Sequence, residues 1–363
     1  MPWYNRFVPG SPETQKLRVV VISDGKPGHE NQSLGIAESL PDADILLLRH
    51  NLREGIAEAF LRLQIMLWSS GRAETIRLLK KVFPEAEIMR LLDHKPAAII
   101  AAGTLSAAPC LLAGRLSGAK TCICMKPSMI ALSRFDLAVL PAHDNPGNER
   151  NVLTTLAAPN RVSPEMLKDE ADKWKPELPA DERPVLSWIV GGASSSAKFD
   201  EEHVSRGLIS ALEWAQNERW QVWLSTARRT PEVLEQRIAE LPAQHPALTW
   251  SLLWHRDQRN PLYAMFHLSR VAVVTSDSVS MIAEAASAGR GPVVYQASDA
   301  VSKRKSKQDR MVDRLLEAGY GMRATGPGEL AMTLGLIEKQ NQQFPMLDDT
   351  AKAASRLLAI IRK

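Results

Sequence analysis

The chain has 363 residues, of which 45% are apolar and 24% charged, and its net charge is +4 with a pI of about 8.9. This length is too great for one small domain and suits two, and the composition is that of an ordinary globular protein. A net charge of +4 is too small for a strongly polycationic protein. It is compatible with anionic small molecules, an anionic membrane surface or nucleic acid, and alone it selects none of them.

The N-terminal residues 1–16 contain no apolar run of the kind a signal peptide needs, and we interpret them as a tail. The uncharged stretch Pro96–Gly114 contains glycine, serine and proline, so it predicts a buried strand, a loop and a helix instead of a membrane span. Three cysteines are too few for a disulfide framework, and we expect a reducing cytoplasm, with Cys122 and Cys124 as buried thiols within an apolar run. The three cysteines are Cys110, Cys122 and Cys124.

Short apolar runs alternate with helical patterns in the first half of the chain. Helical spacing marks Glu54–Leu67 and Ala73–Val82, which lie between runs typical of buried strands. Strands that alternate with helices predict a parallel sheet covered on both faces. The predicted strands are Leu17–Ser23, Ala43–Arg49, Ala97–Ala102, Lys120–Met125 and Asp136–Leu140.

The alternation stops at a charged, proline-bearing segment and then restarts. We predict a first domain over 17–165, a linker over 166–184, a second domain over 185–345, and a C-terminal helix within 346–363 that packs back across the boundary. The fold class is therefore α/β, with two Rossmann-like, doubly wound domains in tandem and a cleft between them. The second set of strands is Val185–Val190, Trp220–Ser225, Leu248–Leu253, Val271–Thr275 and Pro292–Tyr295.

Ligands of such folds bind where strands open into helices, and the first such loop reads SDGKPGHENQ. Gly25 and Gly28 let the backbone approach a ligand, while Lys26 and His29 add a cation and a titratable group; Asn31 follows in the helix. The spacing G-x-x-G matches neither the dinucleotide fingerprint nor the P-loop. The loop predicts an anion or substrate site, with a plain strand–helix turn as the alternative.

Two loops of the second half are rich in hydrogen-bond donors. GGASSSAKFD follows a predicted strand, and Gly191, Gly192 and Ser194 could bind a phosphate or diphosphate; a serine-capped turn is the alternative. Arg228 and Arg229 follow the next strand, where guanidinium groups could bind phosphate, and a solvated basic loop is the alternative.

A further loop, TSDSVSMIAEAASAG, follows the strand Val271–Thr275. Asp277, Ser278 and Ser280 stand at a helix start, where a plain cap is the alternative role for Asp277. Glu284 follows among small residues, and its carboxylate could accept hydrogen bonds from two sugar hydroxyls. Together the four loops indicate a nucleotide-sugar site of the two-domain, GT-B kind, with the donor on the second domain and the acceptor on the first.

The segments DGKPGHENQSLG, RFDLAVLPAHD, ARRTPEVL and VVTSDSVSMIAEA resemble, in this order, the mitochondrial fission Elm-type family. Its plant members are linked to mitochondrial division, and the form of this chain is similar to its bacterial members. The resemblance implies a GT-B glycosyltransferase-like fold. A more distant similarity is to MurG-type transferases, which move N-acetylglucosamine onto a membrane lipid carrier; it implies an acceptor role for Gly28–His29 and a ribose-binding role for Glu284.

We therefore expect a glycosyltransferase that uses a nucleotide sugar, with UDP as the expected nucleotide, and an envelope acceptor. The alternatives are a non-catalytic adaptor on the same scaffold and a nucleotide-sugar epimerase. His29 is the candidate base, and Asp24 and Asp277 are the other candidates. No paired carboxylates show metal-ligand spacing, so we expect metal-independent chemistry and no cofactor.

We expect no nucleic-acid partner, and the oligomeric state is not readable. The segment 51–83 carries an apolar stripe that ends in Trp68, followed by basic residues beside Phe83. It predicts peripheral contact with the cytoplasmic face of the inner membrane, although most such stripes only cover their own sheet.

Overall fold

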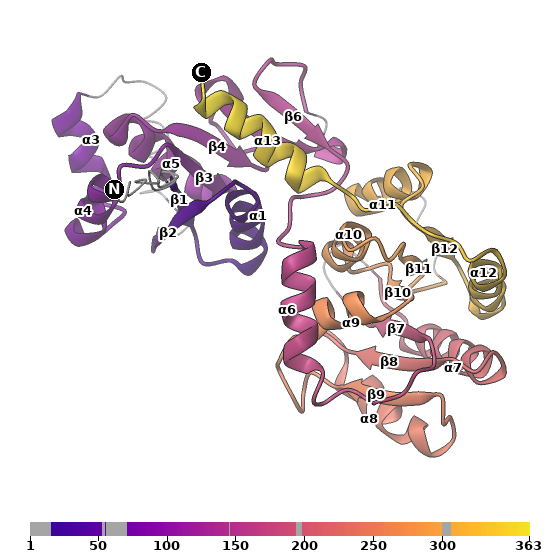
Figure 1. The fold of residues 1–363 in the computed structure, drawn as a ribbon. Coiled ribbons are helices and arrows are strands. Elements are labelled where there is room, and N and C mark those ends of the chain that lie inside the picture. The colour runs from indigo at the N-terminus through magenta and orange to yellow at the C-terminus, as the bar shows by residue number, and fades with distance from the viewer. Residues whose placement is uncertain (1–15, 53–54, 56–70, 145, 194–197, 300–305) are drawn as a thin grey trace, which may run out of the picture. The chain divides into compact units, whose positions relative to one another are not determined.

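The computed structural model describes residues 16–52, 55, 71–144, 146–193, 198–299 and 306–363. The chain divides into two compact units, one formed by residues up to Leu137 together with Ala354–Lys363, and the other by Ala138–Ala353. Two six-stranded sheets form the framework, with strand orders β2-β1-β3-β4-β5-β6 and β12-β11-β10-β7-β8-β9 (Figure 1).

The first sheet is built from apolar strands in parallel pairs. The pairs β1–β2, β1–β3, β3–β4 and β5–β6 are all parallel, as the alternation of strands and helices predicts. Its strands are β1 (Leu17–Ser23), β2 (Ala43–Arg49), β3 (Ala98–Ala102), β4 (Lys120–Cys124), β5 (Leu137–Pro141) and β6 (Val152–Thr155). Its helices are α1 (Pro27–Glu38), α3 (Arg72–Leu79), α4 (Glu85–His94) and α5 (Thr104–Ser117).

The second sheet follows the same plan. Its strands are β7 (Val185–Ile189), β8 (Gln221–Ser225), β9 (Leu248–Leu252), β10 (Val271–Thr275), β11 (Val293–Tyr295) and β12 (Met322–Ala324). Its helices are α6 (Pro164–Trp174), α7 (Glu201–Asn217), α8 (Glu232–Glu240), α9 (Leu262–Leu268), α10 (Val279–Ser287), α11 (Lys307–Glu317) and α12 (Pro327–Gln340), and α13 (Asp349–Ile361) follows them.

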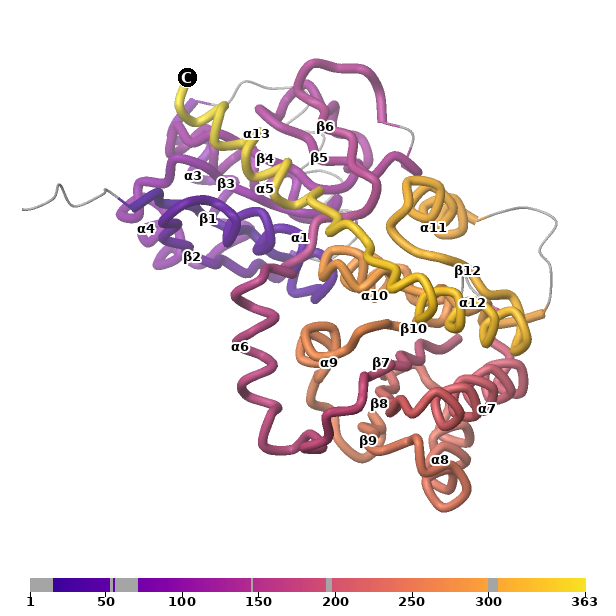
Figure 2. The backbone as a smooth tube through the Cα atoms, turned by 45° about the vertical axis from the view of Figure 1, so that its right-hand side comes forward, coloured from indigo at the N-terminus to yellow at the C-terminus, as the bar shows by residue number. Residues whose placement is uncertain are grey.

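Two hydrophobic cores flank the second sheet, because side chains alternate along each strand. Leu186 and Trp188 pack with α7, α8 and α12, whereas Val185 and Ile189 pack with α9, α10 and α11. Figure 2 shows α7 and α8 on one side of β7 and β8, and α9 and α10 on the other. Burial on both faces explains why these strands are continuous apolar runs.

Each strand predicted from the sequence is present, with its ends within one residue of the prediction. Sequence reasoning missed β6 and β12, which have four and three residues and lack a long apolar run. The three cysteines are free thiols and buried, as predicted for Cys122 and Cys124. The stretch Pro96–Gly114 forms β3, a turn and part of α5, and within the described residues no helix is long and apolar enough to cross a bilayer.

The segment predicted as a linker over 166–184 begins as a helix. The hydroxyl of Ser163 accepts a hydrogen bond from the amide of Met166 and caps α6, which has proline in its first turn. Leu167 and Trp174 are buried on one face of α6, so this charged stretch is an amphipathic helix packed on α9.

Two helical glycines give a matched test of this packing. A Cβ at Gly207 in α7 would overlap the ring of the buried Tyr295, whereas a Cβ at Gly335 in α12 would meet its nearest neighbour, Nε1 of Trp214, at 3.8 Å. We expect Gly207→Ala to lower the free energy of unfolding by about 1–3 kcal/mol through overpacking. We expect Gly335→Ala to raise it by up to about 1 kcal/mol through helix propensity. Urea denaturation measures both, and equal effects of the two substitutions would contradict this packing.

Candidate functional site

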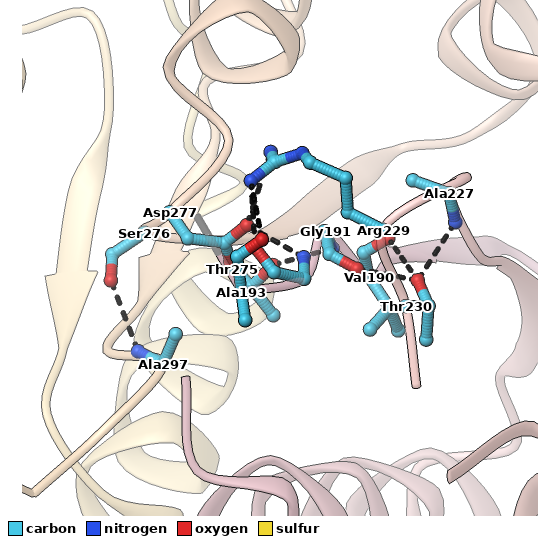
Figure 3. Close-up of polar contacts among 11 residues, drawn as sticks. Val190, Gly191, Ala193, Ala227, Arg229, Thr230, Thr275, Ser276, Asp277 and Ala297 are labelled. Atoms are coloured by element: carbon cyan, nitrogen blue, oxygen red, sulfur yellow. Dashed lines mark hydrogen bonds and ion pairs between the residues drawn. The ribbon is translucent and has the colours of Figure 1, made fainter. Parts of the chain in front are cut away.

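The loop after β7 lies against the loops that follow β8 and β10. The amide of Gly191 donates to Oγ1 of Thr275 at 2.8 Å, and the amide of Gly192 donates to Oδ2 of Asp277 at 2.7 Å (Figure 3). A Cβ on Gly191 would overlap the Asp277 carboxylate, and one on Gly192 would overlap the backbone of Arg229. Both positions therefore need glycine because other parts of the protein approach so closely. Ser194 lies outside the described residues.

The two adjacent arginines after β8 have different surroundings. Arg229 donates through Nη1 to the carbonyl of Gly192 at 2.7 Å, and its Nη2 lies 3.5 Å from Oδ2 of Asp277. Arg228 is exposed and makes no hydrogen bond or ion pair with the part of the chain that the structure describes. Arg229 thus holds the loops together, and Arg228 is the cation available to a ligand.

The residues at the start of α10 are divided between the interior and the surface. Asp277 is 8% exposed, and burial raises the pKa of its carboxyl against the lowering effect of the hydrogen bond from Gly192. Ser278 is the N-cap of α10, but its side chain makes no capping hydrogen bond. Ser280 is exposed. Asp277 is therefore directed at the loop after β7 and does not cap α10.

Glu284 lies within α10 and is half-buried. The hydroxyl of Tyr263 lies 3.5 Å from its Oε1, and burial raises the pKa of Glu284 to about 7. Burial therefore favours the carboxylic acid, which can donate as well as accept, over the carboxylate, which only accepts. In either protonation state the Glu284 side chain can therefore hydrogen-bond to a pair of hydroxyl groups.

A pocket of about 340 Å³ opens at the carboxyl ends of β8 and β9. Arg259 lines it but already pairs with Glu177 and Asp257 and lies 4.7 Å from the ring of Trp174. None of the residues that line the pocket is acidic, so it favours an anionic ligand with an apolar part. Its walls are formed by Ser225, Thr226, Ala227, Arg228, Arg229, Trp254, Gln258, Arg259, Asn260, Pro261, Leu262 and Met281.

The floor of this pocket is fixed by a buried carboxylate that sequence reasoning missed. Glu235 of α8 is 3% exposed and accepts hydrogen bonds from the hydroxyl of Thr226 at 2.5 Å and the amide of His255 at 3.1 Å. The Thr226 hydroxyl in turn accepts from the amide of Trp254 at 2.8 Å. The loops after β8 and β9 are thereby joined. An isolated glutamate inside an amphipathic helix gives no sequence signal for this role.

In the first unit, Asp24 and His29 are paired at the end of β1. Nδ1 of His29 lies 2.9 Å from Oδ2 of Asp24, whose side chain is buried, while the ring of His29 stays partly exposed. A carboxylate at Nδ1 selects the tautomer that leaves Nε2 as a proton acceptor. Lys26 extends the pair, with its Nζ 3.8 Å from Oδ2 of Asp24. This arrangement can remove a proton from a hydroxyl group.

Gly103, which sequence reasoning did not assign, forms the wall behind His29. Its φ is +80°, and a Cβ there would lie 2.6 Å from Cε1 of the imidazole. Gly25, with φ +77°, makes the tight turn after β1, and its amide donates to Oγ of Ser23 at 2.9 Å. Gly28 is exposed and Asn31 half-buried in the first turns of α1, so neither is sealed in the core.

Most of the chain matches a known protein family. The family described as "Mitochondrial fission ELM1" matches residues 27–361. The Mitochondrial fission protein ELM1 of Arabidopsis thaliana is 23% identical over 419 residues, which cover 97% of this chain and 92% of that protein.

Solved structures are similar in fold at low sequence identity. A UDP-GlcNAc 2-epimerase from Methanocaldococcus jannaschii has a TM-score of 0.57 and 12% identity, with 95% of this chain and 100% of that chain covered. A UDP-glucosyltransferase from Polygonum tinctorium has a TM-score of 0.50 and 9% identity, with 96% and 94% covered. These likenesses confirm the predicted fold class of two Rossmann-like domains. The chain belongs to the Mitochondrial fission ELM1 family and has a GT-B-like fold.

Proposed function

We propose that this protein is a glycosyltransferase that moves a sugar from a nucleotide-sugar donor, with UDP as the nucleotide, to an envelope acceptor. The observation that carries the proposal is the pocket beside β8 and β9, which combines apolar walls with the available guanidinium of Arg228. A nucleotide has the matching parts, because its base is flat and largely apolar and its phosphates are anionic.

Each part of a nucleotide sugar has a candidate partner in the second unit. Trp254, Pro261 and Leu262 offer apolar surface for the base, and the amide of Asn260 or Gln258 can recognise its polar edge. Arg228 pairs with the diphosphate. Glu284, one to two turns into α10, accepts hydrogen bonds from the ribose hydroxyls, as the sequence resemblance implies.

The Asp24–His29 pair supplies the proton transfer. Nε2 of His29 takes the proton of the acceptor hydroxyl as that oxygen bonds to the anomeric carbon, and the electron pair of the broken C–O bond leaves with the diphosphate. Arg228 stabilises the charge that develops on the leaving group, so the scheme requires no metal. Asp24 stabilises the imidazolium that forms. The scheme requires both units to bind parts of the same complex during turnover.

Two other functions compete with this one. The adaptor function is favoured by the relative named as a mitochondrial fission protein, and the epimerase function by the fold likeness to a UDP-GlcNAc 2-epimerase. An assay with UDP-sugars distinguishes them, since a transferase consumes an acceptor, an epimerase converts the donor alone, and an adaptor does neither.

The first prediction concerns donor binding. One charge-assisted contact is worth about 1.5–3 kcal/mol, so Arg228→Ala should weaken UDP binding about 10- to 150-fold. Isothermal titration calorimetry at fixed ionic strength measures it. Arg256→Ala is the matched control, because Arg256 is also exposed on a neighbouring loop but does not line the pocket. Equal affinities of the two variants would contradict the assignment of Arg228.

The second prediction concerns proton transfer. Loss of a general base typically costs about 10²- to 10⁴-fold in rate, so His29→Ala should lose turnover to this extent while its affinity for UDP stays unchanged. His94→Ala is the control, since His94 of α4 hydrogen-bonds only to the backbone carbonyl of Asp44 among the described residues. Full transfer by His29→Ala would remove His29 from the mechanism.

The third prediction concerns the membrane. We propose peripheral contact with the cytoplasmic face of the inner membrane through the segment 51–83, of which Leu67 and Trp68 lie outside the described residues. Leu79 and Phe83 are buried, whereas Arg72, Arg77, Lys80 and Lys81 are exposed. Arg77 pairs with Glu74 and Lys80 with Glu85. The contact that we propose for the described part is therefore electrostatic.

Each exposed cation near an anionic surface contributes about 1 kcal/mol. The protein should therefore float with anionic liposomes at low salt and be released at high salt, and the double variant Lys80→Glu/Lys81→Glu should float less. Zwitterionic liposomes are the control. Wild-type protein that stays at the bottom of the low-salt anionic gradient would refute membrane contact.

A further inference from the structure

The Asp277 carboxylate lies in the place where a phosphate would be expected. Its Oδ2 accepts the hydrogen bond from the amide of Gly192 at 2.7 Å, and Nη2 of Arg229 lies 3.5 Å away (Figure 3). A backbone amide in a glycine-rich strand–helix loop and a guanidinium group are the donors that proteins offer to phosphate. In this structure the amide is directed at a carboxylate of the same chain. The guanidinium is shared between that carboxylate and the carbonyl of Gly192, to which its Nη1 donates at 2.7 Å.

The surroundings of Asp277 leave room for its carboxylate beside these donors. The absence of a Cβ at Gly191 makes room for the carboxylate, because a side chain there would overlap Oδ2. Thr275 holds the Gly191 amide at 2.8 Å, and the hydroxyl of Thr230 donates to the Gly191 carbonyl, so the loop is fixed on both sides of the contact. Asp277 is thus built into the loop contact.

The carboxylate is nevertheless incompletely satisfied. The side chain of Asp277 is fully buried, and its Oδ1 has no hydrogen-bond partner among the residues that the structure describes. A buried carboxylate normally accepts several hydrogen bonds, because leaving an oxygen unpaired in the interior costs free energy. An anion that takes over the Gly192 amide and the Arg229 guanidinium can offer more acceptor oxygens than Asp277 does.

We propose that Asp277 is an internal competitor for phosphate, which occupies the Gly192 and Arg229 donors until a diphosphate-bearing ligand displaces it. This inference rests on the proposed function and deepens it, since it assigns to Asp277 control over how strongly the site takes the diphosphate. The apparent affinity for a phosphate ligand is reduced by the fraction of molecules in which Asp277 holds these donors. A nucleoside without phosphate does not meet this competition.

The test compares Asp277→Asn with wild-type protein. Asparagine keeps the shape and an oxygen acceptor for the Gly192 amide but removes the negative charge. Two like charges at contact distance repel strongly, so we expect Asp277→Asn to bind pyrophosphate and UDP at least about tenfold more tightly, with unchanged affinity for uridine. Asp313→Asn is the control for net charge, because Asp313 pairs with Arg323 away from this loop.

Calorimetry with the three probes separates the outcomes. Equal or weaker pyrophosphate binding by folded Asp277→Asn overturns the inference. A second outcome is that Asp277→Asn binds pyrophosphate more tightly than wild-type protein, but UDP binds no more tightly than pyrophosphate and uridine does not bind. In that case the inference stands and the proposed function fails. Should Asp277→Asn not fold, Asp277→Ser provides the neutral side chain, and the same tenfold gain in pyrophosphate affinity is expected.

Discussion

The structure depends on one geometric constraint, which is that the strands of a parallel sheet direct all their carboxyl ends to the same edge. In the second sheet this constraint brings the residues that follow β7, β8 and β10 into contact, although Gly192 and Asp277 are 85 residues apart in the chain. In the first sheet it brings His29 against Gly103. The common strand direction therefore brings the loops of both candidate sites together, and the individual side chains then decide the contacts within each site.

Buried carboxylates organise these edges. Asp24 orients an imidazole, Glu235 joins two loops around a pocket, and Asp277 holds a backbone amide and a guanidinium. The interior makes each of these charges costly, so each must hold its partners at close range. These contacts join the loops, while Arg228 keeps a guanidinium that pairs with none of the described residues. Loops that present an available cation suit an anionic ligand.

Most of the fold could be predicted from the sequence, because a strand buried on both faces is a continuous apolar run and its helices show a 3.6-residue period. The exceptions have the same origin. The strands β6 and β12 are too short to show a pattern, and α6 was hidden in a segment whose charges outnumber its buried residues. The loops of the candidate site could be predicted from glycine, arginine and aspartate at strand ends. The different roles of the two adjacent arginines could not be predicted in this way.

The sequence by itself determined the order of all elements except the short strands β6 and β12 and the helix α6, the loops in which ligand-binding groups gather, and the family. Only the tertiary structure decided which groups face a ligand and which face one another. The sequence pattern predicts ligand binding for both Arg229 and Asp277, yet in the structure both hold the same loop. Glu235 and Gly103 carry no signal in the local sequence, and still they shape the two sites. The physical reason is that local patterns record which backbone conformation and burial each residue prefers, while the pairing of charges depends on distances that exist only after the strands have aligned.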